Sequence, residues 1–149
     1  MKVPDTLNPF LSTPSTPVYT KVYTVYTPKN AFSGDFDYAL PIGGEGAELR
    51  LHLDASYADA QYSFQSESVK AQSSFIVNGR LALADIPMNA NGTKATIALW
   101  GRNLFNETHI YRQSDANTVP VDGKYTGILG SYANFNPPRT FGIEGTVSF

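Results

Sequence analysis

The sequence predicts an all-β fold, an antiparallel meander of about five long strands that is an incomplete, open part of a transmembrane β-barrel. Five stretches alternate apolar and polar residues with period two, which gives a strand two different faces. Charged residues are only 16% of the 149 residues, against about 25% in an average soluble domain, and aromatic residues are 13%. The connections between the stretches alternate between long and short, as they do in outer-membrane barrels.

The last ten residues, 140–149, show the alternation over a whole strand. One face carries Phe141, Ile143, Gly145, Val147 and Phe149, and the other carries only Thr, Gly, Glu and Ser residues. A membrane-spanning barrel strand needs about 9–11 residues, apolar toward lipid and polar toward the lumen. We therefore expect this segment to be the closing strand of the barrel.

Four further stretches have the same pattern. The predicted strands cover residues 30–42, 47–57, 74–85 and 94–105. The glycine-rich turn at 43–46 joins the first two, since Gly adopts the positive φ of hairpin turns, and Asn91-Gly92 is typical of a type I′ turn. The polar segments 62–73 and 106–136 are predicted to be long loops.

The predicted lipid face ends in aromatic residues on the side of the long loops. These are Phe32, Tyr57, Phe75, Phe105 and Phe141, one from each strand. Aromatic rings gather at the headgroup level of membrane barrels, so the pattern predicts an aromatic girdle. The short turns would then lie in the periplasm and the long loops outside the cell.

The N-terminal part differs in composition from the rest. Residues 1–27 are rich in Pro, Thr and Ser and are predicted to be a loop-like segment, whereas residues 28–149 hold the strands. The first residues lack the apolar core of a signal peptide, which we expect if the chain is the C-terminal part of a longer protein. A five-stranded sheet with open edges in lipid points to the same expectation.

Composition excludes several function classes. The net charge of −2 gives no electrostatic footprint for nucleic acid, and the absence of cysteine excludes disulfide scaffolds and cysteine-based metal or redox sites. The sequence contains no run of about 18 apolar residues, so no transmembrane helix is predicted.

Two segments resemble the C-terminal end of TonB-dependent outer-membrane receptors. Residues 99–107 read Leu-Trp-Gly-Arg-Asn-Leu-Phe-Asn-Glu, and residues 136–143 read Asn-Pro-Pro-Arg-Thr-Phe-Gly-Ile, ahead of the terminal Phe149. Residues 26–30, Tyr-Thr-Pro-Lys-Asn, also look like the segment that precedes a strand in that family. The resemblance covers roughly residues 26–149, and the order of the last two motifs is its most specific feature.

The resemblance implies a role in uptake across the outer membrane of a Gram-negative bacterium. The family forms plugged barrels of about 22 strands that import siderophores, cobalamin or glycans with energy from the TonB complex. The chain would be the non-catalytic C-terminal portion of such a receptor. Its implied partners are outer-membrane lipid, the remaining strands and plug, the TonB complex through that plug, and the barrel-assembly machinery through Phe149. The sequence has no plug or TonB box, so no transport residue is carried over.

The residues that could carry chemistry have a structural interpretation. His52 and His109 are the only histidines, and we expect His52 to be a polar lumen residue near Asp37 rather than a ligand or proton site. The acidic residues Asp35, Asp37, Glu45, Glu48 and Asp54 are expected to line a wet face and a turn, not a metal site. No catalytic, cofactor-binding or metal-binding residue is predicted, and no cofactor.

Two groups of residues leave a binding role open. Trp100 with Arg102 either stacks on a ligand or serves as a packing or interface anchor. The loop residues Tyr111, Tyr125, Tyr132 and Asn134 are the expected ligand-facing surface of a parent receptor.

Two alternative interpretations remain. The chain could be a soluble all-β domain, a sandwich or small barrel that binds a ligand or partner, or it could form a small membrane barrel by oligomerisation. The interpretations differ in where the apolar side chains point. In part of a membrane barrel, seven apolar residues are exposed in the isolated chain, and in a soluble domain they lie in a closed two-layer core: Leu49, Leu51, Leu53, Ile97, Leu99, Ile143 and Val147.

Overall fold

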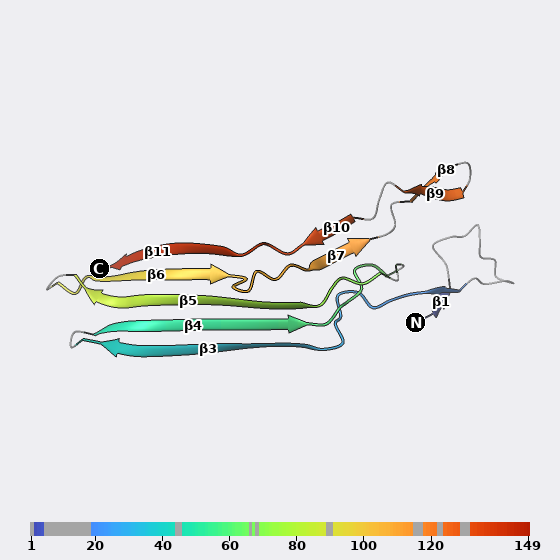
Figure 1. Ribbon diagram of the computed structural model, residues 1–149. Helices are drawn as coiled ribbons and strands as arrows, with labels where there is room; N and C mark the ends of the chain where they lie inside the picture. The colour runs from blue at the N-terminus through green and yellow to red at the C-terminus, as the bar shows by residue number, and fades with distance from the viewer. Residues whose placement is uncertain are drawn as a thin grey trace. The chain divides into compact units, whose positions relative to one another are not determined.

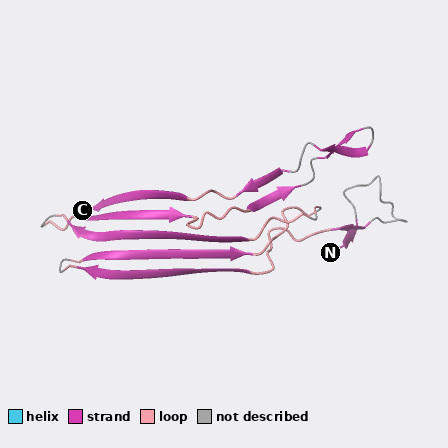
Figure 2. Ribbon diagram, in the orientation of Figure 1, coloured by secondary structure: helices cyan, strands magenta, loops and turns pink. Residues whose placement is uncertain are grey.

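A computed structural model describes residues 2–4, 19–43, 46–65, 67, 69–88, 91–114, 118–121, 124–128 and 132–149 of the chain, with side chains for those in 21–114 and 132–149. The described residues form strands, turns and loops and no helix (Figures 1 and 2), so the all-β prediction is confirmed for them. The strands are β1 (Lys2–Pro4), β2 (Tyr19–Lys21), β3 (Ala31–Ile42), β4 (Ala47–Ala58), β5 (Ser74–Pro87), β6 (Lys94–Arg102), β7 (Ile110–Ser114), β8 (Thr118–Val121), β9 (Lys124–Ile128), β10 (Tyr132–Phe135) and β11 (Thr140–Ser148).

The five long strands form one antiparallel sheet in the order β11-β6-β5-β4-β3. Figure 1 shows them side by side, with β3 and β11 at the two edges. These two strands do not pair with each other, so the sheet is open, as predicted. Every long strand begins within one residue of its predicted start, because period-two alternation marks a strand whose faces differ.

The turn predictions had mixed outcomes. In the turn at 43–46 the two described glycines have φ values of +72° and +89°, as predicted. The prediction of a two-residue type I′ hairpin at Asn91-Gly92 is wrong, since Pro87 pairs with Lys94 and this register does not place the two residues alone between paired strands. The connection is longer than a two-residue turn, because Met88 N–H donates to Thr93 O across it.

One face of the sheet is apolar and open. Its central row, in register across the sheet, consists of Tyr38, Leu51, Leu81, Leu99 and Ile143. Of the seven diagnostic residues, Leu49, Leu51 and Leu53 are half-buried and the other four are exposed, Ile143 by 77%. Within the described part of the chain the buried apolar residues are four alanines, so no second layer covers this face.

The opposite face, called the charged face below, is polar but not uniformly so. Ala82, Ala84 and Ala98 lie on it and are buried, because longer side chains on neighbouring strands cover them. Ile76, which interrupts the polar pattern of β5, is paired with Ser56 on the same face, as the alternation implies.

A β-bulge in β5 keeps apolar residues on one face although their spacing in the sequence changes from two to three. The register with β6 shifts between Leu83 and Ile86, and Asp85 adopts a φ of +55°. The extra residue lets Leu83 and Ile86 both stay on the apolar face while Asp85 reaches Arg50 on the charged face. The bulge therefore adds a carboxylate to the charged face without reversing the faces of the strand.

The remaining elements form a second unit, made of residues 1–30, 59–73 and 109–136. It contains three two-stranded sheets, β1-β2, β7-β10 and β8-β9. The prediction of a structureless loop at 106–136 is wrong, since β7, β8, β9 and β10 lie within it. Segment 62–73 has isolated bridges at Tyr62 and Lys70 but no named strand, in agreement with its prediction as a loop.

Candidate functional site

The charged face carries the polar side chains of all five strands of the sheet. One row in register contains Asp37, His52, Arg80, Trp100 and Gly142. The next row toward the start of β3 contains Asp35, Asp54, Asn78, Arg102 and Thr140. Because side chains two residues apart share a face, these two rows form a continuous polar surface.

His52 lies in a chain of polar contacts from β3 to β5. Its Nδ1 is 2.8 Å from Asp37 Oδ1, and since a carboxylate only accepts, this ring nitrogen donates. Its Nε2 is 3.9 Å from Asp54 Oδ1, and Asn78 Nδ2 donates to Asp54 Oδ2 at 2.7 Å. Asp37 and His52 are directly paired between β3 and β4, so the expectation that His52 lies near Asp37 is confirmed. Exposed contacts of this kind contribute about 1 kcal/mol or less, so they give the sheet modest support.

Two arginines of the charged face are held by carboxylates. Arg50 contacts both Glu48 and Asp85, with Nε 3.0 Å from Glu48 Oε2. Arg80 Nη2 lies 3.0 Å from Glu144 Oε1, an ion pair that reaches from β5 across β6 to β11. The Arg50–Asp85 and Arg80–Glu144 pairs connect different strands, whereas Glu48 and Arg50 both lie on β4, and together these contacts balance charge on this face.

Trp100 and Arg102 form a different arrangement on β6. The Trp100 indole lies over Gly142, where an added Cβ would be 2.3 Å from Trp100 Cζ2, so only glycine leaves room for the ring. The Arg102 guanidinium lies 5.6 Å from the ring centroid, in the range of a cation–π contact. No described carboxylate forms an ion pair with Arg102, whose cross-strand neighbours are Asn78 and Thr140.

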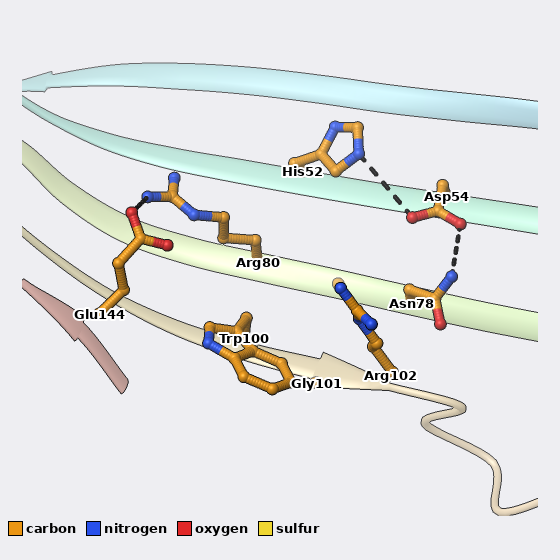
Figure 3. Close-up of a pocket in the computed structure, with 9 residues that line it drawn as sticks. His52, Asp54, Asn78, Arg80, Trp100, Gly101, Arg102 and Glu144 are labelled. Atoms are coloured by element: carbon orange, nitrogen blue, oxygen red, sulfur yellow. Dashed lines mark hydrogen bonds and ion pairs between the residues drawn. The ribbon is translucent and has the colours of Figure 1, made fainter. Parts of the chain in front are cut away.

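These groups surround an open pocket with a volume of about 260 Å³. Figure 3 shows Arg80 joined to Glu144 on one side and the His52, Asp54 and Asn78 contacts on another. The pocket is lined by His52, Asp54, Asn78, Gly79, Arg80, Trp100, Gly101, Arg102 and Glu144. Trp100 and Arg102 stand out in the sequence, but their proximity to Glu144 depends on the pairing of β6 with β11, which joins residues distant in the chain.

Asn103 fixes the backbone that follows the pocket. Its side chain is 4% exposed and its φ is +52°, a conformation that Asn tolerates better than most residues. Its Nδ2 donates to Glu107 O at 2.7 Å and to Pro137 O at 3.2 Å, and its Oδ1 accepts from Glu107 N–H at 2.8 Å. Asn103 N–H in turn donates to Asn78 Oδ1. The motif at 99–107 therefore ends β6 three residues before its predicted end.

Leu104 comes directly after Asn103 in this turn, and its side chain packs on the apolar face. A Cβ on Gly101 would lie 2.6 Å from Leu104 Cδ2, and a Cβ on Gly79 would lie 3.3 Å from its Cδ1. The two glycines pair across β5 and β6, so together they leave a recess for this side chain. This part of the resemblance motif thus has a packing role.

Four of the five aromatic residues of the predicted girdle lie next to one another at one end of the apolar face. Phe32 and Tyr57 are directly paired and stacked, with centroids 4.8 Å apart, and Phe75 stacks on Phe105 at 6.3 Å. Tyr57 also pairs with Phe75, so four of the five aromatics are contiguous. Phe141 lies two rows further along, in register with Gly101 and Gly79, and is contacted by Arg139.

The second unit holds its own cluster of cations and rings. The Tyr23 and Tyr62 centroids are 4.1 Å apart, and Lys21 and Lys70 each lie 4.9 Å from one of these rings. Arg112 lies over Phe64 at 5.0 Å and near Tyr132. These contacts order the unit from within.

The loop candidates are only partly described. Tyr111 is 47% exposed on β7, Tyr132 is 37% exposed on β10, and Asn134 is exposed on β10 opposite Arg112. The side chains of Tyr125 and Glu45 lie outside the described residues. His109 is buried in the second unit, and its N–H donates to Asn136 Oδ1.

Wider comparisons add little to the geometry. No family model, no curated protein and no solved structure matches the chain. Among the residues that the structure describes, no group of three His, Cys, Asp or Glu side chains could hold a metal ion. In the same residues no helix is long and apolar enough to cross a membrane.

Proposed function

We propose that this chain is the C-terminal portion of an outer-membrane TonB-dependent receptor for siderophores or other large nutrients, with no catalytic role of its own. The observation that carries the proposal is an open antiparallel sheet with one continuous exposed apolar face and one charged face. In such a receptor the apolar face contacts lipid and the charged face lines the lumen, toward the plug.

The height of the apolar face supports this proposal. It extends along β3 from Phe32 to Ile42, which is ten residue-to-residue steps or about 33 Å at about 3.3 Å per step. With the usual strand tilt of about 40°, this gives a band of about 25 Å, the height of the apolar belt of membrane barrels. The contiguous rings of Phe32, Tyr57, Phe75 and Phe105 lie at one end of the band, where a headgroup layer would accommodate them.

The soluble alternative lacks the structure it requires. A sandwich needs a second apolar layer over residues such as Leu99 and Ile143, which are 55% and 77% exposed. A soluble monomer rarely exposes a continuous apolar patch of this extent. The exposure therefore favours the membrane proposal over a soluble binding domain.

The alternative of a ring of identical chains meets a topological obstacle. An antiparallel sheet with an odd number of strands has edge strands that run the same way, and Figure 1 shows the β3 and β11 arrows parallel. Joining β11 of one copy to β3 of the next would make a parallel pair, whereas membrane barrels of this class are antiparallel. An odd number of additional strands closes the barrel without that conflict, as the remainder of a larger receptor would.

The proposed partners follow from the two faces and edges. Lipid covers the apolar face, the remaining strands pair with β3 and β11, and the plug lies against the charged face and links it to the TonB complex. Phe149, whose side chain is fully exposed, is the proposed contact for the barrel-assembly machinery.

Tryptophan quenching by lipid tests this proposal directly. The native chain has one tryptophan, Trp100 on the charged face, and a Trp100→Phe, Ile143→Trp variant moves it to the apolar face. After refolding with phosphatidylcholine vesicles whose acyl chains carry bromine, we expect strong quenching of the Ile143→Trp variant and weak quenching of Trp100. Equal quenching at both positions, or a chain that stays monomeric in water and ignores vesicles, would refute the membrane location.

A further inference from the structure

The arginines of the charged face are not equivalent. Arg50 and Arg80 each have a carboxylate partner at hydrogen-bonding distance. In the described part of the chain Arg102 has none, and its neighbours across the sheet, Asn78 and Thr140, carry no charge. The guanidinium of Arg102, with its five N–H donors, therefore lacks the counter-charge that Arg50 and Arg80 have.

The Arg102 guanidinium lies beside the Trp100 ring without any ligand. Gly142 leaves room for the Trp100 indole, and the indole supports the guanidinium from 5.6 Å. A guanidinium held near an aromatic ring by a cation–π contact keeps its N–H donors free, and less rotamer entropy is lost when they bind an oxyanion. The contact therefore favours a planar, bidentate partner.

The acidic groups in the pocket are already engaged. Glu144 accepts from Arg80, and Asp54 accepts from Asn78 and lies close to His52. Neither forms an ion pair with Arg102. Their negative charges nonetheless disfavour a ligand with two charges, such as a phosphate dianion, and a single arginine suits a single charge.

We propose that Trp100 and Arg102 form a binding site for a monovalent carboxylate, open to the pocket of about 260 Å³ on the charged face of the sheet. The carboxylate oxygens accept two parallel hydrogen bonds from the Arg102 fork, and the apolar part of the ligand lies beside the indole. All residues that line the pocket come from strands of this sheet. The site goes beyond the proposed function and does not depend on it.

The single tryptophan makes the site observable. We would titrate the full 149-residue chain in detergent micelles, at constant ionic strength, with para-nitrobenzoate, whose nitro group quenches indole fluorescence on contact. The uncharged para-nitrobenzamide has nearly the same size and serves as the matched probe. We expect saturable quenching by the carboxylate with an affinity at least ~10-fold above that of the amide, because only the carboxylate accepts charge-assisted hydrogen bonds.

Variants of Arg102 separate charge from geometry. Arg102→Gln should remove the preference for the carboxylate, and Arg102→Lys should weaken it roughly threefold or more, because an ammonium group is a point charge without a fork. Arg139→Gln is the control, since Arg139 also lies over a ring, that of Phe141, at 5.5 Å. It should leave the titration unchanged.

The result that would overturn the site is equal quenching by the two probes, or an Arg102→Gln chain that still prefers the carboxylate. Arg102 is exposed, so its variants should keep their fold, which the far-ultraviolet circular dichroism spectrum would verify. The lipid-quenching experiment uses neither probe. Failure of the carboxylate site would therefore leave the proposed membrane location standing, and failure of that location would leave the site standing.

Discussion

At the scale of single residues, Asn103 and Gly142 decide how β6 ends and how its side chains lie. Asn103 is a buried polar side chain with all of its described hydrogen bonds made to backbone atoms that close the turn. Gly142 has no side chain, and the Trp100 indole occupies the space that a side chain there would take. The sequence shows both residues plainly but not these roles, because each depends on a strand or segment that lies about 34 to 42 residues away in the chain.

Substitution of Asn103 should destabilise the sheet in a graded way. Asn103→Gly keeps the positive φ but removes three side-chain hydrogen bonds, worth about 1 kcal/mol each, so we expect a loss of about 3 kcal/mol. Asn103→Ala should lose about 1 kcal/mol more, because alanine resists that φ. Urea unfolding in micelles, followed by Trp100 fluorescence, measures both. Asn134→Ala, at an exposed position, should stay within about 0.5 kcal/mol of the native chain.

The two glycines of β11 give a second matched pair. In Gly142→Ala the new Cβ would lie 2.3 Å from Trp100, so the ring must move, and we expect a cost of about 1–3 kcal/mol with a shifted Trp100 emission maximum. In Gly145→Ala nothing lies within 4 Å, so stability should stay equal or rise by up to about 1 kcal/mol. Emission spectra and urea midpoints of the two variants decide the matter, and indistinguishable spectra would contradict the close packing of Trp100 on Gly142.

At the scale of elements, alternation in the sequence predicts the five long strands and their faces, because each has one apolar and one polar side. It fails where local signals are weak. The end of β6 is set by the Asn103 turn, the short strands β7 and β10 lie in a stretch without clear alternation, and the connection at 88–93 does not form the expected turn. The cross-strand pairs around the pocket depend on register, which a single sequence leaves largely open.

The bulge at Asp85 predicts how β5 should respond to the deletion of single residues. Deleting Asp85 removes the extra residue but leaves Leu83 and Ile86 on the apolar face, so only exposed ion pairs are lost and stability should change by about 1 kcal/mol or less. Deleting Ala82 instead moves Leu83 onto the charged face, and we expect that chain not to form the sheet. Circular dichroism and urea unfolding compare the two deletions. A severe loss in the Asp85 deletion would mean that the bulge itself shapes the sheet.

At the scale of the whole molecule, the sheet has one apolar face, one charged face and two edge strands that run in the same direction. These features limit what can surround it. The apolar face needs a cover, and the edges need strands. Under the proposed function, lipid would cover the face and the remaining strands of a receptor would pair with the edges, whereas a soluble partner would have to cover a band about 25 Å high. The family resemblance suggested this arrangement from a few motif residues, and the exposure of the apolar face is an independent argument for it.

A charge on the apolar face distinguishes lipid from water. Leu99 lies in the central row and is 55% exposed, so on a soluble sheet Leu99→Arg would be harmless or would improve solubility. In a membrane barrel an arginine at this depth costs about 2–4 kcal/mol, which corresponds to a ~30-fold to ~900-fold loss of vesicle-bound chain. Flotation of refolded chain with phosphatidylcholine vesicles measures this loss. Thr96→Arg, on the same strand but facing the charged side, should float as the native chain does, because its charge stays on the side where Arg50 and Arg80 already lie. Equal flotation of both variants would mean that the apolar face does not meet lipid.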